Sequence, residues 1–197
     1  MLLAVPPFVV TLDANILYGM PLCDTMLRAA EAGLYHPTWS YEIWGEVLRH
    51  LMDPLERERP LSQADADRRL AAAERSFPIS FVSDYQHLVA TMTNDPKDRH
   101  VAAVAVRAHA HVIVTYNLKH FPDASLAPYG VEAQHPDDFL TDLYDLDPDT
   151  ITAIIRGQAA ALRKRPTSPQ EVLTRLEQVG ITQFARLVSA HFDEGML

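Results

Sequence analysis

The chain has 197 residues, of which 48% are hydrophobic and 22% are charged, a balance that indicates an ordinary folded protein and excludes a disordered one. Its single cysteine, Cys23, excludes an internal disulfide framework and a cysteine-rich zinc site. The formal net charge of −9 has the wrong sign for a nucleic-acid binder, so such a function would require local basic patches and metal ions that neutralise an acidic site.

The apolar runs of the sequence are far shorter than the roughly 18 residues that a membrane-spanning helix needs. The first residues carry no basic segment and are interrupted by Pro6 and Pro7, unlike a secretory signal peptide. We therefore expect a cytoplasmic protein that does not associate with membranes.

The first elements in chain order are a strand pattern, a helix and a second short strand. Residues 8–12 (FVVTL) have the apolar run of a buried strand and end directly before Asp13. Residues 25–32 form a helical pattern that stops at Gly33, and residues 34–36 are a candidate strand. Asp13 is thereby expected at the carboxyl end of a strand.

A longer helix is predicted over residues 41–51 (YEIWGEVLRHL), where apolar residues recur at helical spacing and Ser40 is the N-cap. Glu42 and Glu46 lie four residues apart on this helix and share a face. Of the two, we prefer Glu46 for an acidic site because Glu42 falls nearer the helix start. The patterns that follow predict a helix over 62–76, a strand over 79–82 and a helix over 85–92.

Residues 95–122 contain a capped helix and a buried strand in one unbroken unit. Pro96 biases Asp95 away from helical angles, so Asp95 as the N-cap predicts a helix that has started by Lys97. Residues 112–114 (VIV) form a short β-branched run without alternation, which is typical of a parallel strand buried on both faces.

Thr115 and Asn117 directly follow this second buried strand. In open α/β sheets, ligands gather outside the carboxyl ends of the strands. A helix that precedes a parallel strand runs antiparallel to it, so Asp98, at the start of the helix, is expected level with the end of the strand. The sequence therefore predicts a site at this edge of the sheet.

The last part of the chain has an all-helical character. An edge strand over 131–133 and a helix over 136–143 precede three helical patterns that begin at Asp147. The apolar residues of the middle pattern need a surface to pack on, either the main domain or another chain, and the second case would make the protein a homodimer or bind it to a partner. These residues are Val172, Leu173, Leu176 and Val179.

Four polar residues are expected to converge at the sheet edge: Asp13, Glu46, Asp98 and Asn117. Carboxylates that cannot neutralise one another are costly together unless a divalent cation binds, and oxygen ligands suit Mg²⁺ or Mn²⁺ rather than zinc. Four histidines offer no clear third metal ligand, and we interpret them as polar edge residues: His100, His109, His111 and His120.

Four segments together resemble PIN-domain proteins of the VapC ribonuclease toxin type: VTLDAN at 10–15, SYEIWGEVLRHL at 40–51, DPKDRHVAAVAVRAHAHVIVTYNLKHFP at 95–122 and HPDDFL at 135–140. The resemblance implies an α/β fold, a PIN-like doubly wound parallel sheet flanked by helices, with an all-α C-terminal tail. It places a nuclease domain at residues 5–145 and a helical extension at 146–197.

The resemblance also implies a Mg²⁺-dependent endoribonuclease that cleaves single-stranded RNA and is restrained by a cognate antitoxin. By position, Asp13, Glu46 and Asp98 are its three acids and metal ligands, with Asn15 and Thr115 in support. Many family members have a fourth acid where this chain has Asn117, which leaves the number of metal ions open. Candidates for contacts to the RNA backbone are Arg49, Lys97, Arg99 and Lys119.

Each of these residues also has a purely structural interpretation. Asp98 could cap a helix N-terminus, Asp13 could begin a turn, and Thr115 could either hold Asp13 or end its strand without a further role. The ordered conjunction favours a site. The alternative is a PIN-like domain, weakly active or inactive, that binds RNA or a partner protein, and its motive is the missing fourth acid at Asn117. A receiver-like signalling domain is disfavoured because Lys119 is its only candidate lysine.

Overall fold

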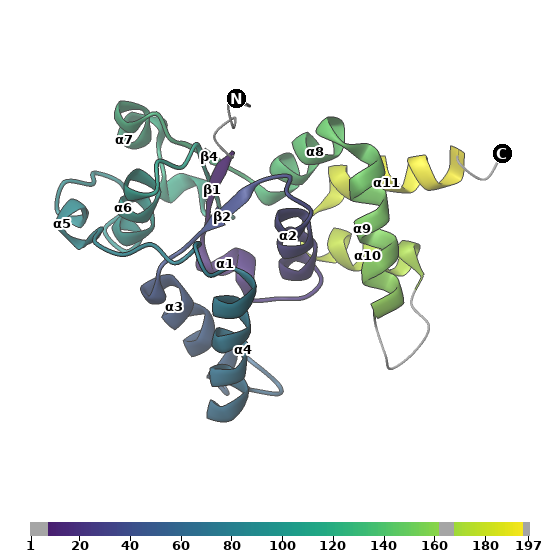
Figure 1. The fold of residues 1–197 in the computed structure, drawn as a ribbon, viewed down its shortest axis with the longest axis horizontal. Helices are drawn as coiled ribbons and strands as arrows, with labels where there is room; N and C mark the ends of the chain where they lie inside the picture. The colour runs from purple at the N-terminus through teal and green to yellow at the C-terminus, as the bar shows by residue number, and fades with distance from the viewer. Residues whose placement is uncertain (1–7, 162–167, 195–197) are drawn as a thin grey trace, which may run out of the picture. The chain divides into compact units, whose positions relative to one another are not determined.

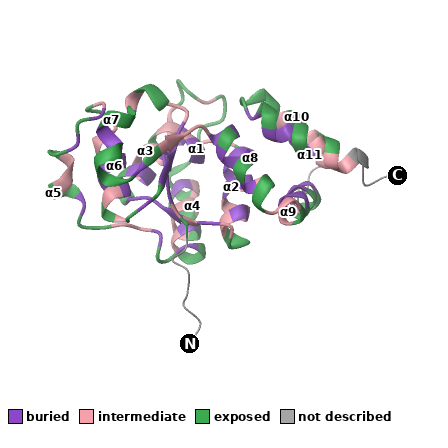
Figure 2. Cartoon of the chain, turned by 90° about the horizontal axis from the view of Figure 1, so that it is seen from above, coloured by how far each residue is buried: buried purple, intermediate pink, exposed green. Residues whose placement is uncertain are grey.

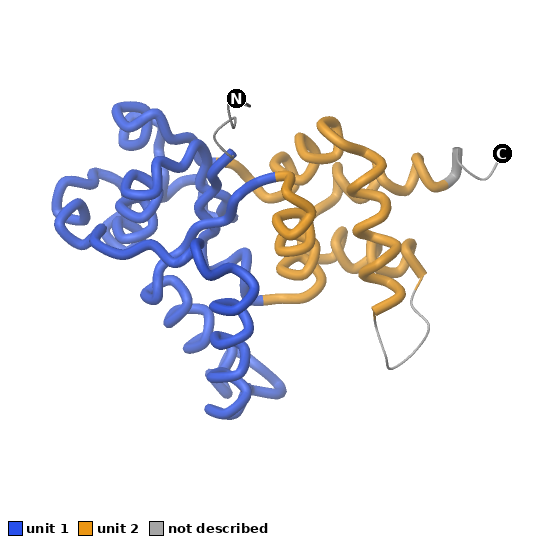
Figure 3. Tube along the Cα trace, in the orientation of Figure 1, with its two compact units in different colours: residues 1–18, 35–133 blue, residues 19–34, 134–197 orange. Residues whose placement is uncertain are grey.

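The computed structural model describes residues 8–161 and 168–194 of the chain (Figure 1). Contacts group the chain into two compact units: unit 1 contains residues up to 18 and 35–133, and unit 2 contains residues 19–34 and those from 134 onward (Figure 3). The domain limits expected from the sequence, 5–145 and 146–197, stay a prediction. The contacts divide the chain earlier and join residues 19–34 to the C-terminal unit.

Unit 1 is built on a four-stranded sheet with the order β2-β1-β3-β4. The strands are β1 (Val9–Leu12), β2 (His36–Thr38), β3 (Val112–Val114) and β4 (Glu132–Gln134). Strand β1 pairs in parallel with both β2 and β3, and Leu12 lies opposite Val114. Because the chain moves outward in one direction from β1 and in the other from β3, the topological switch point lies between these two strands.

The helices of unit 1 are α1 (Ala14–Leu17), α3 (Tyr41–Met52), α4 (Gln63–Ser76), α5 (Gln86–Val89), α6 (Arg99–Arg107) and α7 (Asp123–Leu126), with 3₁₀ turns η1 (Leu118–His120) and η2 (Ala127–Tyr129). Helix α6 packs on β1 and β3, and its residues Val101–Ala105 are fully buried. Burial is concentrated on the strands and on the inner faces of the helices (Figure 2). The expected α/β fold is confirmed.

Local contacts explain where element boundaries agree with the sequence and where they do not. The side chain of Ser40 accepts a hydrogen bond from Ile43 N, which confirms the predicted N-cap of α3. The strand predicted over 34–36 is wrong by two residues, because Leu34 N bonds Ala29 O and so closes the preceding helix, leaving β2 to begin at His36.

Two short elements predicted between α4 and α6 are largely absent. In place of a strand over 79–82 there is a single bridge between Phe81 and Trp39, whose ring is fully buried. The helix predicted over 85–92 is reduced to α5, after which the hydroxyl and the N–H of Thr91 both donate to Leu88 O in a turn.

Unit 2 consists of α2 (Leu22–Glu31), α8 (Pro136–Leu146), α9 (Pro148–Ala161), α10 (Pro169–Gln178) and α11 (Thr182–Glu194). Helix α10 packs on α9 and α11, and Val172, Leu173 and Leu176 are buried there, while Val179 stays 42% exposed. The chain itself therefore supplies the surface that covers this apolar face, and a homodimer stays a prediction. No helix among the described residues is long and apolar enough to cross a membrane.

A buried carboxylate joins two helices of unit 2. Asp137, in the first turn of α8, is 7% exposed and accepts backbone hydrogen bonds at the start of α11. Oδ2 accepts from Thr182 N at 3.1 Å and Gln183 N at 2.9 Å, and Oδ1 accepts from Phe184 N at 3.0 Å. Asp137 thus supplies from a distant part of the sequence the acceptors that a helix N-terminus lacks.

We predict that Asp137→Ala destabilises the protein by on the order of 2 kcal/mol, because three N–H groups lose their acceptor. Urea denaturation should show this loss. Asp138→Ala is the matched control. Asp138 is next to Asp137 in the sequence but is exposed, so this substitution should change stability by no more than about 0.5 kcal/mol. Equal effects of the two substitutions would contradict the role of Asp137.

Candidate active site

Asp13 lies at the carboxyl end of β1, where it is the N-cap of α1 and only 3% exposed. Its Oδ1 accepts from Ala14 N at 2.7 Å, and its Oδ2 accepts from Thr115 Oγ1 at 2.6 Å and Asn15 Nδ2 at 2.7 Å. The expected turn role is confirmed, because the carboxylate caps α1, and the same carboxylate also contacts Thr115 at the end of β3.

Thr115 ties the ends of β1 and β3 together. Besides donating to Asp13, its hydroxyl oxygen accepts from Asn117 N at 2.9 Å and from Asn15 Nδ2 at 3.2 Å. Asn15 Oδ1 in turn accepts from Tyr116 N at 3.3 Å. Of the two roles open for Thr115, the structure shows the hydroxyl that holds Asp13.

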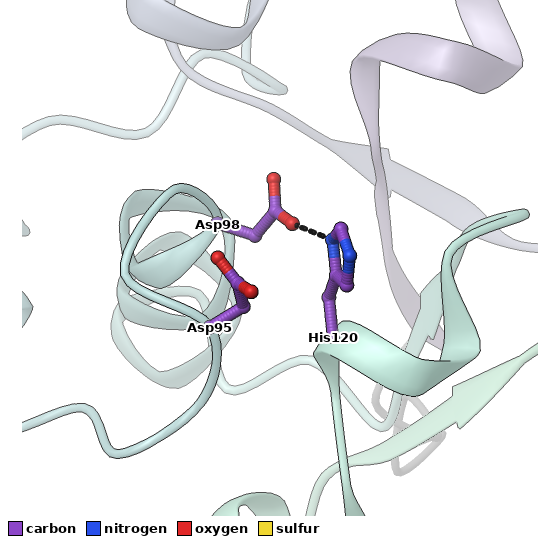
Figure 4. A group of neighbouring side chains, drawn as sticks. All are labelled: Asp95, Asp98 and His120. Atoms are coloured by element: carbon purple, nitrogen blue, oxygen red, sulfur yellow. Dashed lines mark hydrogen bonds and ion pairs between the residues drawn. The ribbon is translucent and has the colours of Figure 1, made fainter.

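Asp98 occupies the N-cap position of α6, but its side chain makes no capping hydrogen bond. The helix begins at Arg99, so the predicted start by Lys97 is wrong. Asp95 Oδ1 accepts instead from Lys97 N at 3.0 Å, and Asp95 O accepts from Asp98 N at 3.0 Å, which makes residues 95–98 a turn. The carboxylate of Asp98 is thus available to other partners, and its Oδ2 lies 2.6 Å from His120 Nδ1 (Figure 4).

Glu46 and Glu42 have different surroundings on α3. The side chain of Glu46 is 28% exposed, and its Oε1 lies 3.4 Å from Nε2 of the buried His100. Glu42 is exposed and accepts from the Tyr85 hydroxyl at 2.8 Å. Glu42 and Glu46 therefore have different partners, and the charge of Glu46 contributes to the raised pKa of Asp13.

The acids lie within electrostatic reach of one another. Burial raises the pKa of Asp13 to about 6, the charges of Asp98 and Glu46 add to this, and the hydrogen bonds from Thr115 and Ala14 oppose it. Burial, followed by the charges of Asp13 and Glu46, likewise raises the pKa of Tyr18 to about 12. The site therefore concentrates negative charge in a poorly solvated place.

The negative charges of the neighbouring acids also affect the pKa of His100. Its burial alone would lower the pKa of the imidazole, but the interaction with Glu46, followed by the charges of Glu42 and Asp13, outweighs burial and raises it.

Of the four basic residues expected at the rim, Arg49 lies beside Glu46 in a hollow of about 270 Å³, which is also lined by Tyr18 and His50, whose rings stack at 4.1 Å. Lys97 and Lys119 are exposed, and Arg99 is half-buried and donates to Asn94 O at 3.3 Å.

Sequence analysis interpreted His120 as a polar edge residue, whereas the structure places its ring beside the carboxylate of Asp98. Within the part of the chain that the structure describes, one group of potential metal ligands has atoms within 4.8 Å of one another, and it consists of Asp95, Asp98 and His120 (Figure 4). His120 follows Asn117 by three residues, at the end of the 3₁₀ turn η1. A search for polar residues that reached one such turn beyond the end of β3 would have found it. Of the other three histidines, His100 lies beside Glu46.

Comparison with known proteins shows the family. A family model described as "PIN domain" matches residues 9–119, which include the ends of β1 and β3. The chain belongs to the PIN-domain family. A second model, "VapC50 C-terminal domain", matches residues 136–190, which include α8 and the part of α11 that Asp137 contacts.

A protein of Mycobacterium tuberculosis (strain ATCC 25618 / H37Rv) named "Putative ribonuclease VapC50" is 46% identical to the chain over 177 residues, or 89% of this chain and 92% of that protein. No solved structure matches the chain significantly. The resemblance to PIN-domain proteins of the VapC type, found in the sequence, is confirmed along with the helical C-terminal part.

The raised pKa of Asp13 predicts how the stability of the metal-free PIN domain depends on pH. The folded state holds the proton more tightly than the unfolded state, whose carboxyl has a pKa near 3.8, so Asp13 lowers stability as pH rises from about 4 to about 6. Two pKa units correspond to roughly 3 kcal/mol.

Asp13→Asn should remove this decrease. Urea denaturation of chelator-treated wild type and variant at several pH values should show the variant gaining on the wild type by on the order of 2 kcal/mol between pH 4 and 7. A stability difference that stays constant over this range would show that Asp13 titrates as an ordinary surface carboxyl.

Proposed function

We propose that the chain is a metal-dependent endoribonuclease that hydrolyses phosphodiester bonds of single-stranded RNA and acts as the toxin of a VapBC-type toxin–antitoxin system. The observation that carries the proposal is the buried carboxylate of Asp13 at the switch point of the sheet, whose pKa burial raises and the charges of Asp98 and Glu46 raise further. The name of the relative from Mycobacterium tuberculosis, "Putative ribonuclease VapC50", supports a ribonuclease of the VapC type.

The donor set fits a hard divalent cation, which we propose to be Mg²⁺, with Mn²⁺ as a substitute. Carboxylate oxygens are the ligands such ions prefer, and burial with mutual repulsion gives these acids a reason to bind one. Asp13, Asp98 and Glu46 would hold the ion. When bound, it would orient the scissile phosphate and make water a stronger nucleophile.

The remaining residues of the site have positioning roles in this proposal. Thr115 and Asn15 fix the carboxylate of Asp13 through the hydrogen bonds at 2.6 and 2.7 Å. Asn117 brings an amide at the end of β3, which can position a water molecule or a phosphate oxygen without adding charge. The contacts to the RNA backbone would come from Arg49, Lys97, Arg99 and Lys119.

An antitoxin protein is the proposed partner, because VapC-type toxins are restrained by one, and a homodimer is a further possibility for the assembly. We propose a cytoplasmic location, where both RNA and antitoxin would be met. The net charge of −9 makes general attraction to RNA weak, so binding of the substrate would depend on the basic residues at the rim and on the cation.

The second candidate function is a PIN domain of weak or no activity that binds RNA or a partner protein. Asn117 favours it, because this chain lacks a negative charge where many family members have one. The two candidates differ in whether removing a proposed metal ligand abolishes cleavage or leaves the behaviour unchanged.

Cleavage of pooled single-stranded RNA, with Mg²⁺ or with EDTA, tests the proposal. Glu46→Gln should lower the metal-dependent rate by at least about 100-fold, because even the loss of an outer partner of a metal ligand can cost that much. Glu42→Gln is the matched control on the same helix and should retain the rate, since Glu42 bonds Tyr85 instead. Equal rates for the two variants, or cleavage that EDTA does not affect, would refute the proposed site.

Asn117→Asp should tighten binding of Mg²⁺, because a hard cation gains from each anionic oxygen in its shell. Without metal the same change crowds like charges and should lower the melting temperature. Melting the variant with and without Mg²⁺ separates the two effects. A response to Mg²⁺ no larger than that of the wild type would place Asn117 outside the metal site.

A further inference from the structure

Asp98 and Glu46 each face the imidazole ring of a histidine, and the ring nitrogen that lies nearest the carboxylate differs between the two pairs. Asp98 Oδ2 lies 2.6 Å from Nδ1 of His120, and Glu46 Oε1 lies 3.4 Å from Nε2 of His100. The histidines come from separate elements, η1 and α6, so the arrangement is not a by-product of one turn of helix.

Backbone hydrogen bonds fix the position of His120 independently of the contact between its ring and Asp98. Its N–H donates to Asn117 O at 2.8 Å, and its carbonyl accepts from Asp95 N at 3.1 Å. The turn that contains Asp98 is therefore attached to η1 by the main chain as well as by the imidazole. An ionised carboxylate can only accept hydrogen bonds, so Nδ1 must be the donor, and the bond fixes Oδ2 of Asp98.

His100 has a different environment but faces its acid in the same way. The residue is 6% exposed, and its Nε2 is buried without a hydrogen-bond partner of good geometry among the described residues. Glu46 Oε1, at 3.4 Å, is within ion-pair distance of that nitrogen. Burying an imidazole nitrogen without a hydrogen bond is costly, so the nearby carboxylate is what offsets its burial.

We propose that His120 and His100 are positioning residues that orient the carboxylates of Asp98 and Glu46 toward a shared divalent cation. The inference rests on the cation site of the proposed function and adds to it a second layer of residues. Metal sites commonly fix their carboxylate ligands with hydrogen bonds like that between His120 and Asp98, and loss of such a partner typically costs about 10- to 100-fold in metal affinity.

Because Nδ1 of His120 and Nε2 of His100 face the carboxylates, the proposal predicts different effects of asparagine and glutamine at the two positions. The amide nitrogen of asparagine stands as far from the backbone as Nδ1 of histidine, whereas that of glutamine reaches about as far as Nε2. At position 120, asparagine should therefore replace histidine and glutamine should not. At position 100 the order should be reversed.

The experiment is calorimetric titration of the full chain with Mn²⁺, which needs no RNA and no cleavage. We expect His120→Gln and His120→Ala to weaken Mn²⁺ binding by about 10- to 100-fold and His120→Asn to stay within a few-fold of the wild type. His100→Asn should weaken binding more than His100→Gln. His87→Ala, at an exposed position on α5, is the control and should bind like the wild type.

Melting of the metal-free variants separates positioning from a purely structural role. If affinity for Mn²⁺ follows metal-free stability instead of the nitrogen position, the proposal is overturned. It is also overturned if His120→Asn loses as much affinity as His120→Ala, since His120 would then be a ligand, or if all three variants at position 120 bind like the wild type. Because His100 is buried, the variants at position 120 decide the question if those at position 100 do not fold.

If the proposed cation site itself does not exist, the titrations give a different result. In that case the wild type and Asp13→Asn would give the same Mn²⁺ titration, and the positioning role would fall with the site. A wild type that binds Mn²⁺ more tightly than Asp13→Asn, combined with indifferent histidine variants, would refute only the role of the histidines.

Discussion

The hydrogen bond from Thr115 to Asp13 depends on the parallel pairing of β1 with β3, and it fixes the one buried carboxylate among the three proposed metal ligands. Leu12 and Val114 are register partners, so the residues that follow them emerge side by side at the same edge of the sheet. The hydroxyl then meets the carboxylate at 2.6 Å. A one-residue slip of register would turn one of the two side chains to the other face of the sheet and leave Asp13 buried without this donor.

Part of this arrangement could be predicted from the sequence because it follows from local rules. The β-branched run at 112–114 forms β3 as predicted, and Ser40 caps α3 as predicted. The start of α6 could not be predicted in the same way, since an Asp-Pro pair satisfies a helix N-cap and an Asx turn equally well. The structure shows a turn over residues 95–98, in which Asp95 accepts from Lys97 N and Asp98 N, and the contact of Asp95 N with His120 O, distant in the sequence, holds this turn in place.

Two contacts that sequence analysis missed join residues far apart in the chain. His120 meets Asp98 across a separation of 22 residues, and Asp137 meets Phe184 across 47. Neither pair has a spacing that marks it, because both ends lie at element boundaries whose relative placement is set by packing. The position of Asp13, in contrast, followed from the strand pattern alone, which is why the acids were easier to predict than their partners.

The way the three acids are satisfied bears on how the site can hold its charge. Asp13 receives its hydrogen bonds from neutral donors, and in the described part of the chain the ion pairs of Glu46 and Asp98 are with histidines rather than with lysine or arginine. Neutral donors such as those around Asp13 fix the direction of a carboxylate without cancelling its charge, whereas a guanidinium would do both. The amide at Asn117 fits the same balance, because a fourth carboxylate would add repulsion that these donors do not neutralise. A site built this way keeps its negative charge for a cation that arrives from solution.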